Sequence, residues 1–593
     1  MDKKEKNFSA WFWIPTLYIA KAISFIIITS VSVIMYQSLE VSNSEIIFYT
    51  SLLYLPWLIK PFWSPLIDAI GTKRDWILFT QVLLAISFIV IAFLIQLPDY
   101  FQFTIIALWI VSFIAATHDI AVDGFYLVAL KESDQSFFIG IRNSFYKIAL
   151  ISTATLVLLF SNQIEKIFSV SPAEFKVVAN PNKFFEETIK VDSLTIKQKP
   201  GPLKLVSSTS YLEISTKPKT KDQVVFYANF ARNMNMMNGF VPQSIVLPDT
   251  SMLNDLVGNI GIIKFHLSKK PSEKDEYVIS LKFVDGDNKF KVIEGNTLKF
   301  TSLNWNKPAF AVIQIDSNVT NKTIATFSAG VEKFSFGWTI TFGFLSLIFL
   351  LLFVFHKFIL PYPSNDEALI EKKNTTVGKE FFRSFARYFE KKKIILIILF
   401  FILYLFGHSQ ITKVLPQFLT DDKIIGGLYL QNYIVKIIKG ISTITFALGS
   451  LIAGFIIYKK GLKSLMMIFT LMMNISLAVY IYLSWFLPNN FWIVTSLIGF
   501  ENLCYGFGFS LILMYILNVS EGNYPSSHFA ISFGFMSLGI LLSEFSSLII
   551  KDSFGYKYFF IWVLISTIPS FILVKLIPIE YNFGKKKISE SQL

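Results

Sequence analysis

Long apolar segments recur along this chain of 593 residues, and they constrain its fold more than any other feature. A helix needs about 20 consecutive apolar residues to span the hydrocarbon core of a membrane. Charged residues make up only 16% of the chain, whereas soluble domains contain about 25%. The sequence therefore predicts an all-α polytopic membrane protein with twelve transmembrane helices, at residues 11–38, 44–70, 75–97, 101–130, 134–161, 335–358, 393–419, 426–458, 464–487, 490–519, 524–551 and 555–578.

A charged region separates these segments into two groups of six. A long polar region follows the fifth segment, and a shorter charged region follows the sixth. We therefore expect five helices in residues 1–161, a separate domain in 162–333, the sixth helix in 334–360, a linker in 361–392, a second bundle in 393–580 and a tail in 581–593.

Basic residues mark one side of the predicted membrane protein. They cluster at the N-terminus, in the turn Lys73-Arg74, in the linker, at Lys459-Lys460 and in the tail, and the predicted topology places all of these on one side. Basic loops face the cytoplasm, so we expect both termini there and residues 162–333 outside. The net charge of +13 follows from this bias and does not indicate a nucleic-acid partner. Aromatic residues at positions 381, 385 and 389 of the linker predict an amphipathic helix in the membrane interface.

Residues 162–333 have the pattern of a β-domain. Apolar and polar residues alternate in 277–284 and again in 289–293, and 285–288 can form a turn, which together predict a hairpin. Similar runs at 203–214, 224–230, 261–267 and 308–315 predict further strands. About 170 residues can support a domain of their own, and we expect a β-sandwich inserted between the fifth and sixth helices.

Several ionisable residues lie within the apolar segments of the first bundle, where a charge costs on the order of 3 kcal/mol unless it faces protein or water. Asp119 and Asp123 are four residues apart, so both carboxylates project from one helical face beside His118. Three lysines predict a cationic interior that suits carboxylates or phosphates: Lys21, Lys60 and Lys147. The alternative is that each lysine pairs with a nearby aspartate, Asp68 included.

The second bundle contains two residues that can carry protons. His408 and Glu501 both lie in apolar segments, and modest changes of environment would let either titrate near neutral pH. The alternative for His408 is a structural, hydrogen-bonded histidine. The sequence has no phosphate-binding loop, no metal cluster and a single cysteine, Cys504. These features predict a protein that is not an enzyme and needs no cofactor or metal.

Four motifs resemble those of a known family. Residues 55–68 (LPWLIKPFWSPLID), 116–123 (ATHDIAVD), 500–508 (FENLCYGFG) and 527–530 (SHFA) resemble, in the same order, patterns of the AmpG muropeptide permeases. This family belongs to the major facilitator superfamily, which the arrangement of six plus six helices also resembles, and it is related to the acetyl-coenzyme A transporters.

The resemblance implies proton-coupled import of peptidoglycan fragments, the anhydro-muropeptides, across the bacterial inner membrane by alternating access. It implies functional roles for Lys60, Trp63, Asp68, Asp119, Asp123, Glu501 and Asn502. Together with the residue patterns, it gives a substrate site, a proton site formed by His408 and Glu501, and a cytoplasmic gate. The expected substrate ligands are Lys21, Lys60, Trp63, Lys147 and Asn502. The expected gate residues are Asp68, Lys73, Arg74, Asp119, Asp123 and Arg142. Asp119 and Asp123, together with the turn Lys73-Arg74, would latch this gate.

Two features depart from the family pattern. His118 and His528 stand where the family commonly has glutamine, and residues 162–333 have no counterpart in the common pattern. That domain could capture a ligand, dock an envelope protein or restrict the entry mouth. Two other functions therefore stay open: transport of another anion, such as an acyl-coenzyme A or a siderophore, and a membrane scaffold or binding protein that acts through the outer domain.

Overall fold

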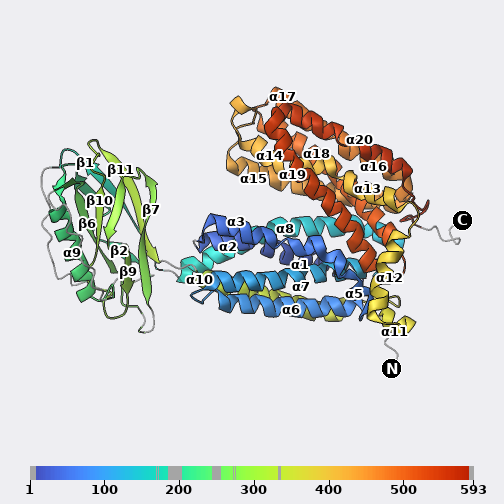
Figure 1. Cartoon of the computed structure of the whole chain (residues 1–593), viewed down its shortest axis with the longest axis horizontal. Helices are drawn as coiled ribbons and strands as arrows, with labels where there is room; N and C mark the ends of the chain where they lie inside the picture. Colours follow the sequence, from blue (N-terminus) through green and yellow to red (C-terminus); the bar gives the residue numbers. More distant parts are fainter. Residues whose placement is uncertain are drawn as a thin grey trace. The chain divides into compact units, whose positions relative to one another are not determined.

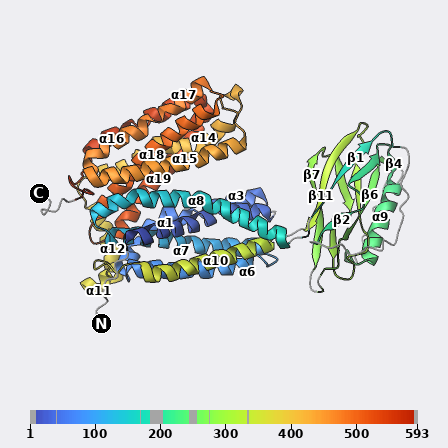
Figure 2. The same ribbon diagram turned by 180° about the vertical axis from the view of Figure 1, so that it is seen from behind.

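The chain forms a helical unit and a β-rich unit, which the computed structural model places in Met1–Leu159 with Thr339–Leu593 and in Phe160–Trp338. The structure describes residues 9–39, 41–168, 170, 172–183, 203–242, 255–271, 273, 276–331 and 335–586. Figure 1 and Figure 2 show the two units from opposite sides.

Helices of the first bundle begin with α1 (Ala10–Ile26), a π-helical turn (Ile27–Val31) and α2 (Ser32–Ser38). The predicted second segment is broken into α3 (Asn43–Leu52), α4 (Leu55–Ile59), a 3₁₀ turn (Lys60–Phe62) and α5 (Ser64–Ala69). Pro56, Pro61 and Pro65 stand at the starts of the last three pieces, because proline lacks the N–H that a continuous helix would need. The bundle continues with α6 (Lys73–Leu94), α7 (Tyr100–Ala129), α8 (Glu132–Phe168) and α10 (Ser335–Ile359).

The second bundle follows two linker helices, α11 (Leu369–Lys373) and α12 (Val377–Phe389). It contains α13 (Ile394–Tyr404), α14 (Phe406–Thr420), α15 (Asn432–Lys460), α16 (Leu462–Ile475), α17 (Ala478–Phe486), α18 (Phe491–Ser520), α19 (Pro525–Ile565) and α20 (Ile568–Leu576). The predicted last two segments both fall within α19 and α20, where Gly555 interrupts the helical backbone with φ 69°. Among the described residues, ten stretches of helix are long and apolar enough to cross a membrane. The broken second segment and the merged last pair account for the difference from twelve.

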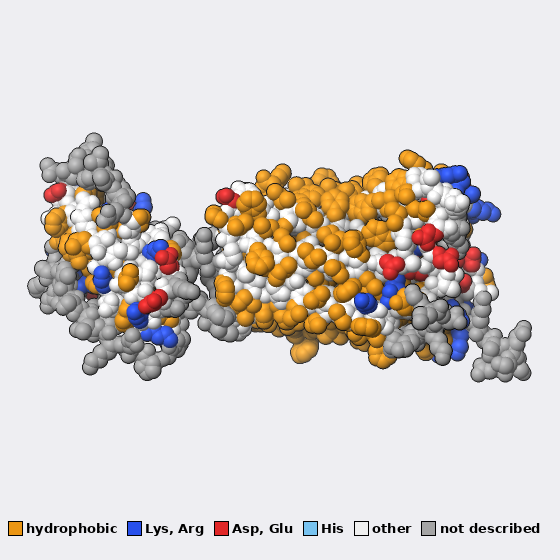
Figure 3. All heavy atoms as spheres, turned by 90° about the horizontal axis from the view of Figure 1, so that it is seen from below, with side chains coloured by type: hydrophobic (Ala, Val, Ile, Leu, Met, Phe, Trp, Pro, Cys, Tyr) orange, Lys and Arg blue, Asp and Glu red, His pale blue; other side chains and the backbone are white. Residues whose placement is uncertain are grey.

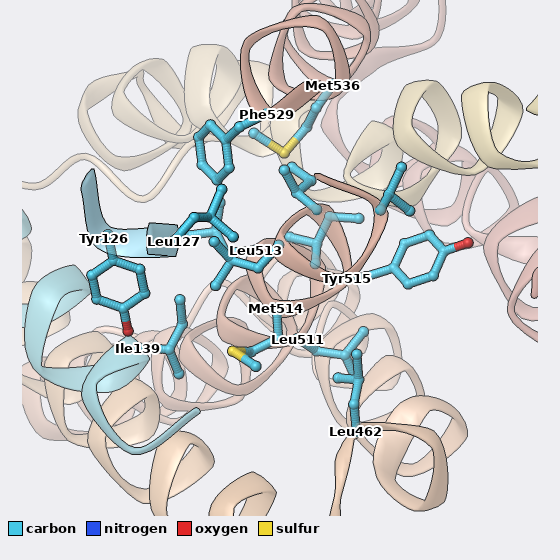
Figure 4. Packing of buried hydrophobic residues seen from close by; sticks show 14 of the residues in the cluster. Tyr126, Leu127, Ile139, Leu462, Leu511, Leu513, Met514, Tyr515, Phe529 and Met536 are labelled. Carbon is cyan, nitrogen blue, oxygen red and sulfur yellow. The ribbon is translucent and has the colours of Figure 1, made fainter. Parts of the chain in front are cut away.

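The two bundles meet in a shared hydrophobic core. Tyr126, Leu127 and Ile139 of the first bundle pack in one cluster with residues of α16, α18 and α19 (Figure 4). Helices α8 and α15 approach each other closely at two glycines of this region. A Cβ on Gly140 of α8 would lie 2.2 Å from the backbone oxygen of Ser450 in α15, and one on Gly454 would lie 2.9 Å from that of Ser136. Glycine is therefore needed for this crossing of α8 with α15.

Both described ends of the chain lie at the start of α8. The ring of Trp11 is 5.9 Å from that of Phe137, and Ser136 Oγ donates to the Gly584 carbonyl oxygen at 2.5 Å. The side of the helical unit seen in Figure 3 is largely hydrophobic, and its charged side chains gather at the end that carries the linker helices in Figure 1. We refer to this end, with the turns at 71–72 and 521–524, as the linker end.

The β-rich unit is a two-sheet sandwich with one helix. One sheet has the order β3 (Tyr211–Ser215), β1 (Ala173–Asn180), β11 (Thr323–Val331), β7 (Tyr277–Gly286) and β9 (Thr297–Phe300); the other has β2 (Leu205–Ser207), β6 (Ile260–Leu267), β10 (Ala309–Ile315) and β8 (Phe290–Glu294). Both sheets contribute to one core, with Phe175 and Phe327 from the first and Phe265 from the second. A short ladder pairs β4 (Lys219–Thr220) with β5 (Leu256–Val257).

Two predictions within this unit were wrong. Residues 224–230 belong to the helix α9 (Lys221–Met237), which Thr220 caps and which packs on Phe310 and Val312 of β10. The strands β7 and β8 do not form a hairpin, because β7 pairs with β11 and β9 while β8 pairs with β10. Asp285 and Gly286 of the predicted turn are the last residues of β7, and the chain crosses to the other sheet at 287–289.

Candidate functional site

Five ionised side chains form a buried network in the first bundle. Lys21 of α1 binds two carboxylates of α7, with its Nζ 2.7 Å from Asp119 Oδ1 and 2.6 Å from Asp123 Oδ2. Lys60, which is 1% exposed, binds the other oxygen of Asp119. Arg142 Nη2 of α8 lies 3.5 Å from Asp123 Oδ1. Three cations therefore surround two carboxylates, and the network has one excess positive charge. We call it the cation network.

Aromatic rings enclose the cation network. The Tyr18 hydroxyl donates to Asp123 Oδ1 at 3.0 Å, and the Arg142 guanidinium lies 4.7 Å from the ring centres of both Tyr18 and Tyr126. Lys60 Nζ lies 4.5 Å from the ring centre of Phe533 in α19. Such cation–π contacts stabilise charges that have lost their water. They also connect the network to the second bundle.

The network decides between two alternatives for the lysines. Lys21 and Lys60 pair with aspartates, and Asp119 and Asp123 contact these lysines and Arg142 instead of the turn Lys73-Arg74. Among the described residues, these two carboxylates form no ion pair with Lys73 or Arg74. The reason is geometric, since one face of α7 points toward α1 and the 3₁₀ turn at Lys60.

Lys147 lies apart from the cation network. Its Nζ lies 5.5 Å from the ring centre of Phe446 in α15, and its side chain is partly buried. Within the part of the chain that the structure describes, no carboxylate lies within ion-pair distance of Lys147. The expected substrate ligand Trp63 also lies elsewhere: its indole N–H donates to Thr117 Oγ1 at 3.2 Å. A membrane lysine without a counter-ion is a candidate ligand for an anionic substrate.

Glu501 and His408 come together in the second bundle. His408 Nδ1 lies 3.0 Å from Glu501 Oε1, although the pair lacks hydrogen-bond geometry. The other oxygen, Oε2, accepts from the Tyr480 hydroxyl at 2.9 Å and from Asn502 Nδ2 at 3.0 Å. Glu501 is fully buried, and the His408 ring stacks on Tyr505 with centres 3.5 Å apart. Sequence patterns indicated both titratable residues, whereas the partner Tyr480 carried no signal.

Asp68 forms a contact between the bundles at the linker end. Its carboxylate accepts hydrogen bonds from the backbone N–H groups of Ser526 and Ser527 at 3.2 and 2.8 Å, and from the Ser527 hydroxyl at 2.5 Å. These are the first residues of α19, which has no cap from its own sequence. A carboxylate at a helix N-terminus satisfies free N–H groups and the helix dipole. Lys73 Nζ lies 3.5 Å from Asp68.

The linker completes this contact through residues that the sequence analysis missed. Asp366 accepts from the backbone N–H groups of Lys73 and Arg74 at 2.8 and 3.0 Å, and so caps α6. Arg74 donates to the Lys357 carbonyl oxygen at 2.6 Å. Burial raises the pKa of the Asp366 carboxyl, against the opposing effect of Lys73. Capping by a residue nearly 300 positions away has no local sequence pattern.

His118 joins a different polar chain. Its Nε2 lies 3.3 Å from Gln81 Nε2, which lies 2.8 Å from His356 Nδ1 in α10, and His356 Nε2 lies 2.9 Å from the Thr16 hydroxyl. His118 therefore turns away from the two carboxylates beside it in sequence. Among the described residues, no group of three or more histidine, cysteine, aspartate or glutamate side chains could hold a metal ion.

Comparisons with known proteins relate this architecture to transporters. The sequence of residues 21–137 matches the BT1 family. The chain superposes on the E. coli fucose:proton symporter FucP (N162A) with a TM-score of 0.51 and 10% identity, covering 95% of this chain and 97% of that one. FucP in the outward conformation, described as a Major Facilitator Superfamily transporter, gives 0.50 with the same identity and coverage.

A bacterial homologue of the iron transporter ferroportin in an outward-facing state gives a TM-score of 0.48 at 10% identity, over 95% of this chain and 96% of that one. The likeness to FucP shows that the chain has the fold of the major facilitator superfamily.

Proposed function

We propose that this protein is a secondary active transporter that carries a carboxylate-bearing solute in symport with protons. The observation that carries the proposal is the buried pair of Glu501 and His408 inside the second bundle of a fold shared with a proton symporter. A carboxylate buried in a membrane helix is costly when charged. Proton uptake removes that cost, so the charge of Glu501 can be coupled to a conformational change.

The contacts of Glu501 suit a proton carrier. The Tyr480 hydroxyl and Asn502 amide both donate to Oε2, so that oxygen is stabilised as an acceptor. Oε1 and His408 Nδ1 face each other at 3.0 Å, and neither has a hydrogen-bond partner in the described chain. A proton between these two atoms would satisfy both. Loss of that proton would leave a buried carboxylate without a cationic lysine or arginine beside it.

Lys147 is the proposed anchor for the substrate anion. It faces α15 from α8, and Lys439 of α15 is close enough to repel it electrostatically. Two lysines that repel each other across the two bundles would both gain from an anion between them. In alternating access by rocking of the two bundles, such an anion would bind Lys147 of the first bundle and Lys439 of the second.

Two substrate classes fit these features. Anhydro-muropeptides are favoured by the resemblance of residues 500–508, which contain the proton-site residues Glu501 and Asn502. Folates are favoured by the match of residues 21–137 to the BT1 family of folate/biopterin transporters. Both classes carry carboxylates that Lys147 can bind. Acyl-coenzyme A and siderophores are further anions that the same test can include.

The proposed location is the bacterial inner membrane, with the linker end in the cytoplasm. The inserted unit connects the end of α8 to the start of α10, and these are the ends of both helices that lie away from the linker. It would then be periplasmic. The bundles are in contact at the linker end, which corresponds to an outward-facing state. A scaffold function of the outer unit would predict stoichiometric co-purification with an envelope protein and no transport.

Uptake into proteoliposomes tests the proposal. The purified chain is reconstituted with an inward proton gradient, and accumulation of radiolabelled anhydro-muropeptide and folate is measured with and without a protonophore. We expect accumulation of one of them, abolished by the protonophore.

Glu501→Gln should lose accumulation but keep exchange of labelled for unlabelled solute, because binding does not need the proton. Glu544→Gln is the matched control, since this partly exposed carboxylate pairs with Lys413. Accumulation that persists without a gradient would exclude symport.

A further inference from the structure

The linker helix α12 carries three stripes of residues, each with a spacing of four. Glu380, Ser384 and Tyr388 form a buried stripe. The aromatic stripe beside it consists of Phe381, Phe385 and Phe389, and the basic stripe on the other side consists of Lys379, Arg383 and Arg387. A helix has 3.6 residues per turn, so residues four apart stay on one side. The helix therefore presents a different chemistry to each of three directions.

The buried stripe pairs with the start of α19, one residue at a time. The Tyr524 hydroxyl donates to Glu380 Oε2 at 2.5 Å, His528 Nε2 lies 3.2 Å from the Ser384 carbonyl oxygen, and Tyr388 Oη lies 3.0 Å from Ser532 Oγ. Each pair is separated by 144 positions. The two helices thus run in parallel and in register, and we call these three pairs the linker ladder.

The linker ladder holds the helix end that Asp68 caps. Asp68 of the first bundle accepts from the N–H groups of Ser526 and Ser527, which lie between the first and second rungs. A movement of α12 would therefore displace the N–H groups that close the contact between the bundles. The middle rung is incomplete, since Ser384 Oγ and His528 Nδ1 have no hydrogen-bond partner in the described chain. Such a contact is suited to separation during a transport cycle.

The basic stripe of α12 is exposed, whereas the aromatic stripe packs on the bundle through the partly buried Phe385 and is exposed at Phe389. Phe389 is 50% exposed, the adjoining Phe382 is 74% exposed, and the Arg387 side chain is 70% exposed. Residues 377–393 contain six basic side chains and two acidic ones. The membrane helix α13 begins immediately afterwards, at Ile394. Basic and aromatic residues on an amphipathic helix beside a membrane span bind anionic headgroups.

We propose that α12 binds the anionic phospholipid headgroups of the surrounding bilayer, and that this contact keeps the linker end closed through the linker ladder. The exposed rings of Phe382 and Phe389 insert at the level of the headgroups, and the basic stripe with the adjacent lysines binds their phosphates. The lipid therefore favours the arrangement in which α12 supports the start of α19. Membranes poor in anionic lipid favour opening of this end.

Spin-label distances in nanodiscs test this proposal on the full chain. Labels are placed at Lys131→Cys and Asn523→Cys, which are exposed on the two bundles at the linker end. The native Cys504 is 2% exposed, so we expect it to stay unlabelled. The chain without the two added cysteines is treated with the label as the control. In discs of phosphatidylcholine with phosphatidylglycerol, compared with phosphatidylcholine alone, we expect the short-distance population to rise about twofold or more.

Three variants separate lipid binding from its transmission. Lys379→Gln with Arg387→Gln and Lys392→Gln should abolish the response and reduce the number of phosphatidylglycerol molecules retained in native mass spectrometry. The matched control removes three exposed lysines from the α15–α16 turn: Lys459→Gln, Lys460→Gln and Lys463→Gln. Tyr388→Phe with Glu380→Gln should retain the lipid but lose the distance response.

Three outcomes would overturn the proposal. They are equal short-distance populations in both lipid mixtures, an equal loss of response in the control triple variant, and a wild-type response in the ladder variant. The first would show that anionic lipid does not control closure of the linker end, and the second that any loss of basic charge has the same effect. The third would show that the linker ladder does not transmit the effect of lipid binding.

Discussion

At the scale of the residue, Lys21 occupies the position that unites the charges of the first bundle. Its ammonium group lies between Asp119 and Asp123, and the other oxygens of these carboxylates bind Lys60 and Arg142. Removal of a single member therefore affects charges on α1, α7, α8 and the 3₁₀ turn together. The excess positive charge of the network also favours an anion in the interior of the protein.

Asp119→Asn should strongly destabilise the protein. Lys60 would keep its charge in a buried site without a carboxylate, and breaking a buried ion pair costs about 3–5 kcal/mol. Thermal unfolding can be followed by the reaction of Cys504, which is buried in the folded chain, with a thiol-reactive dye. The double variant Asp119→Asn with Lys60→Met should recover most of the loss. A double variant as unstable as the single one would show that the pair itself is unimportant.

The ionisable residues of the site could be predicted from the sequence, but their partners could not. Lys21, Lys60, Asp119, Asp123, His408 and Glu501 stand out because a charge or a titratable group is rare in an apolar segment. Which lysine meets which aspartate depends on how α1 and the 3₁₀ turn pack against α7, and no local pattern encodes that packing. For the same reason Tyr18, Tyr480 and Asp366 gave no signal.

At the scale of the element, the crossing of α8 and α15 depends on Gly140. Gly140→Ala would place a Cβ 2.2 Å from the Ser450 oxygen and 2.7 Å from Leu451 Cα, and backbone atoms cannot move aside as a flexible side chain can. We expect the bundles to separate at the linker end, with longer distances between labels at positions 131 and 523. Gly343→Ala in α10 is the control, because nothing lies within 4 Å of that Cβ. Unchanged distances in Gly140→Ala would contradict the proposed closure.

The turn between α18 and α19 should make stability at this end depend on pH. Burial, together with Glu132 of α8 and Glu580 after α20, raises the pKa of Glu521 from 4.5 to about 7, while Lys391 opposes the shift. A raised carboxyl pKa stabilises the fold at low pH, and this contribution is lost as the pH rises from about 4.5 through 7. The melting temperature, measured by tryptophan fluorescence, should fall less over this range in Glu521→Gln. Parallel curves for the two proteins would contradict the assignment.

The elements themselves were predicted unevenly. The sequence predicts the long apolar helices because about 20 apolar residues leave little choice of structure, whereas its local pattern predicts a strand where α9 forms. Its residues 224–230 are rich in valine and aromatic side chains, which favour strands locally. The helix forms because its whole length, capped by Thr220, lays one face on β10. The breaks in the second segment follow from its three prolines, which hydrophobicity alone does not reveal.

At the scale of the whole molecule, the chain combines a helical membrane unit with a β-rich unit inserted into it. The inserted unit has a hydrophobic core of its own, formed by the two sheets. Its first and last strands, β1 and β11, are antiparallel neighbours, with Ala173 paired to Ala329. The chain therefore enters and leaves this unit at adjacent points, about 5 Å apart for antiparallel partners. An insertion of this kind needs no distortion of the helices that flank it.

Each unit should consequently fold without the other. In one variant, residues 170–331 are replaced by a short Gly-Ser linker; in the other, residues 170–331 are produced alone. We expect the first to give a single sharp melting transition by tryptophan fluorescence in detergent, close to that of the full chain. We expect the second to be soluble, with the circular dichroism of a β-protein and cooperative unfolding by urea, because about 160 residues can bury a sufficient core.

Aggregation of the shortened chain, or non-cooperative unfolding of the isolated unit, would show that the two depend on each other for stability. If both fold, transport by the shortened chain then measures what the inserted unit contributes, since any loss of uptake could no longer be attributed to a damaged membrane unit.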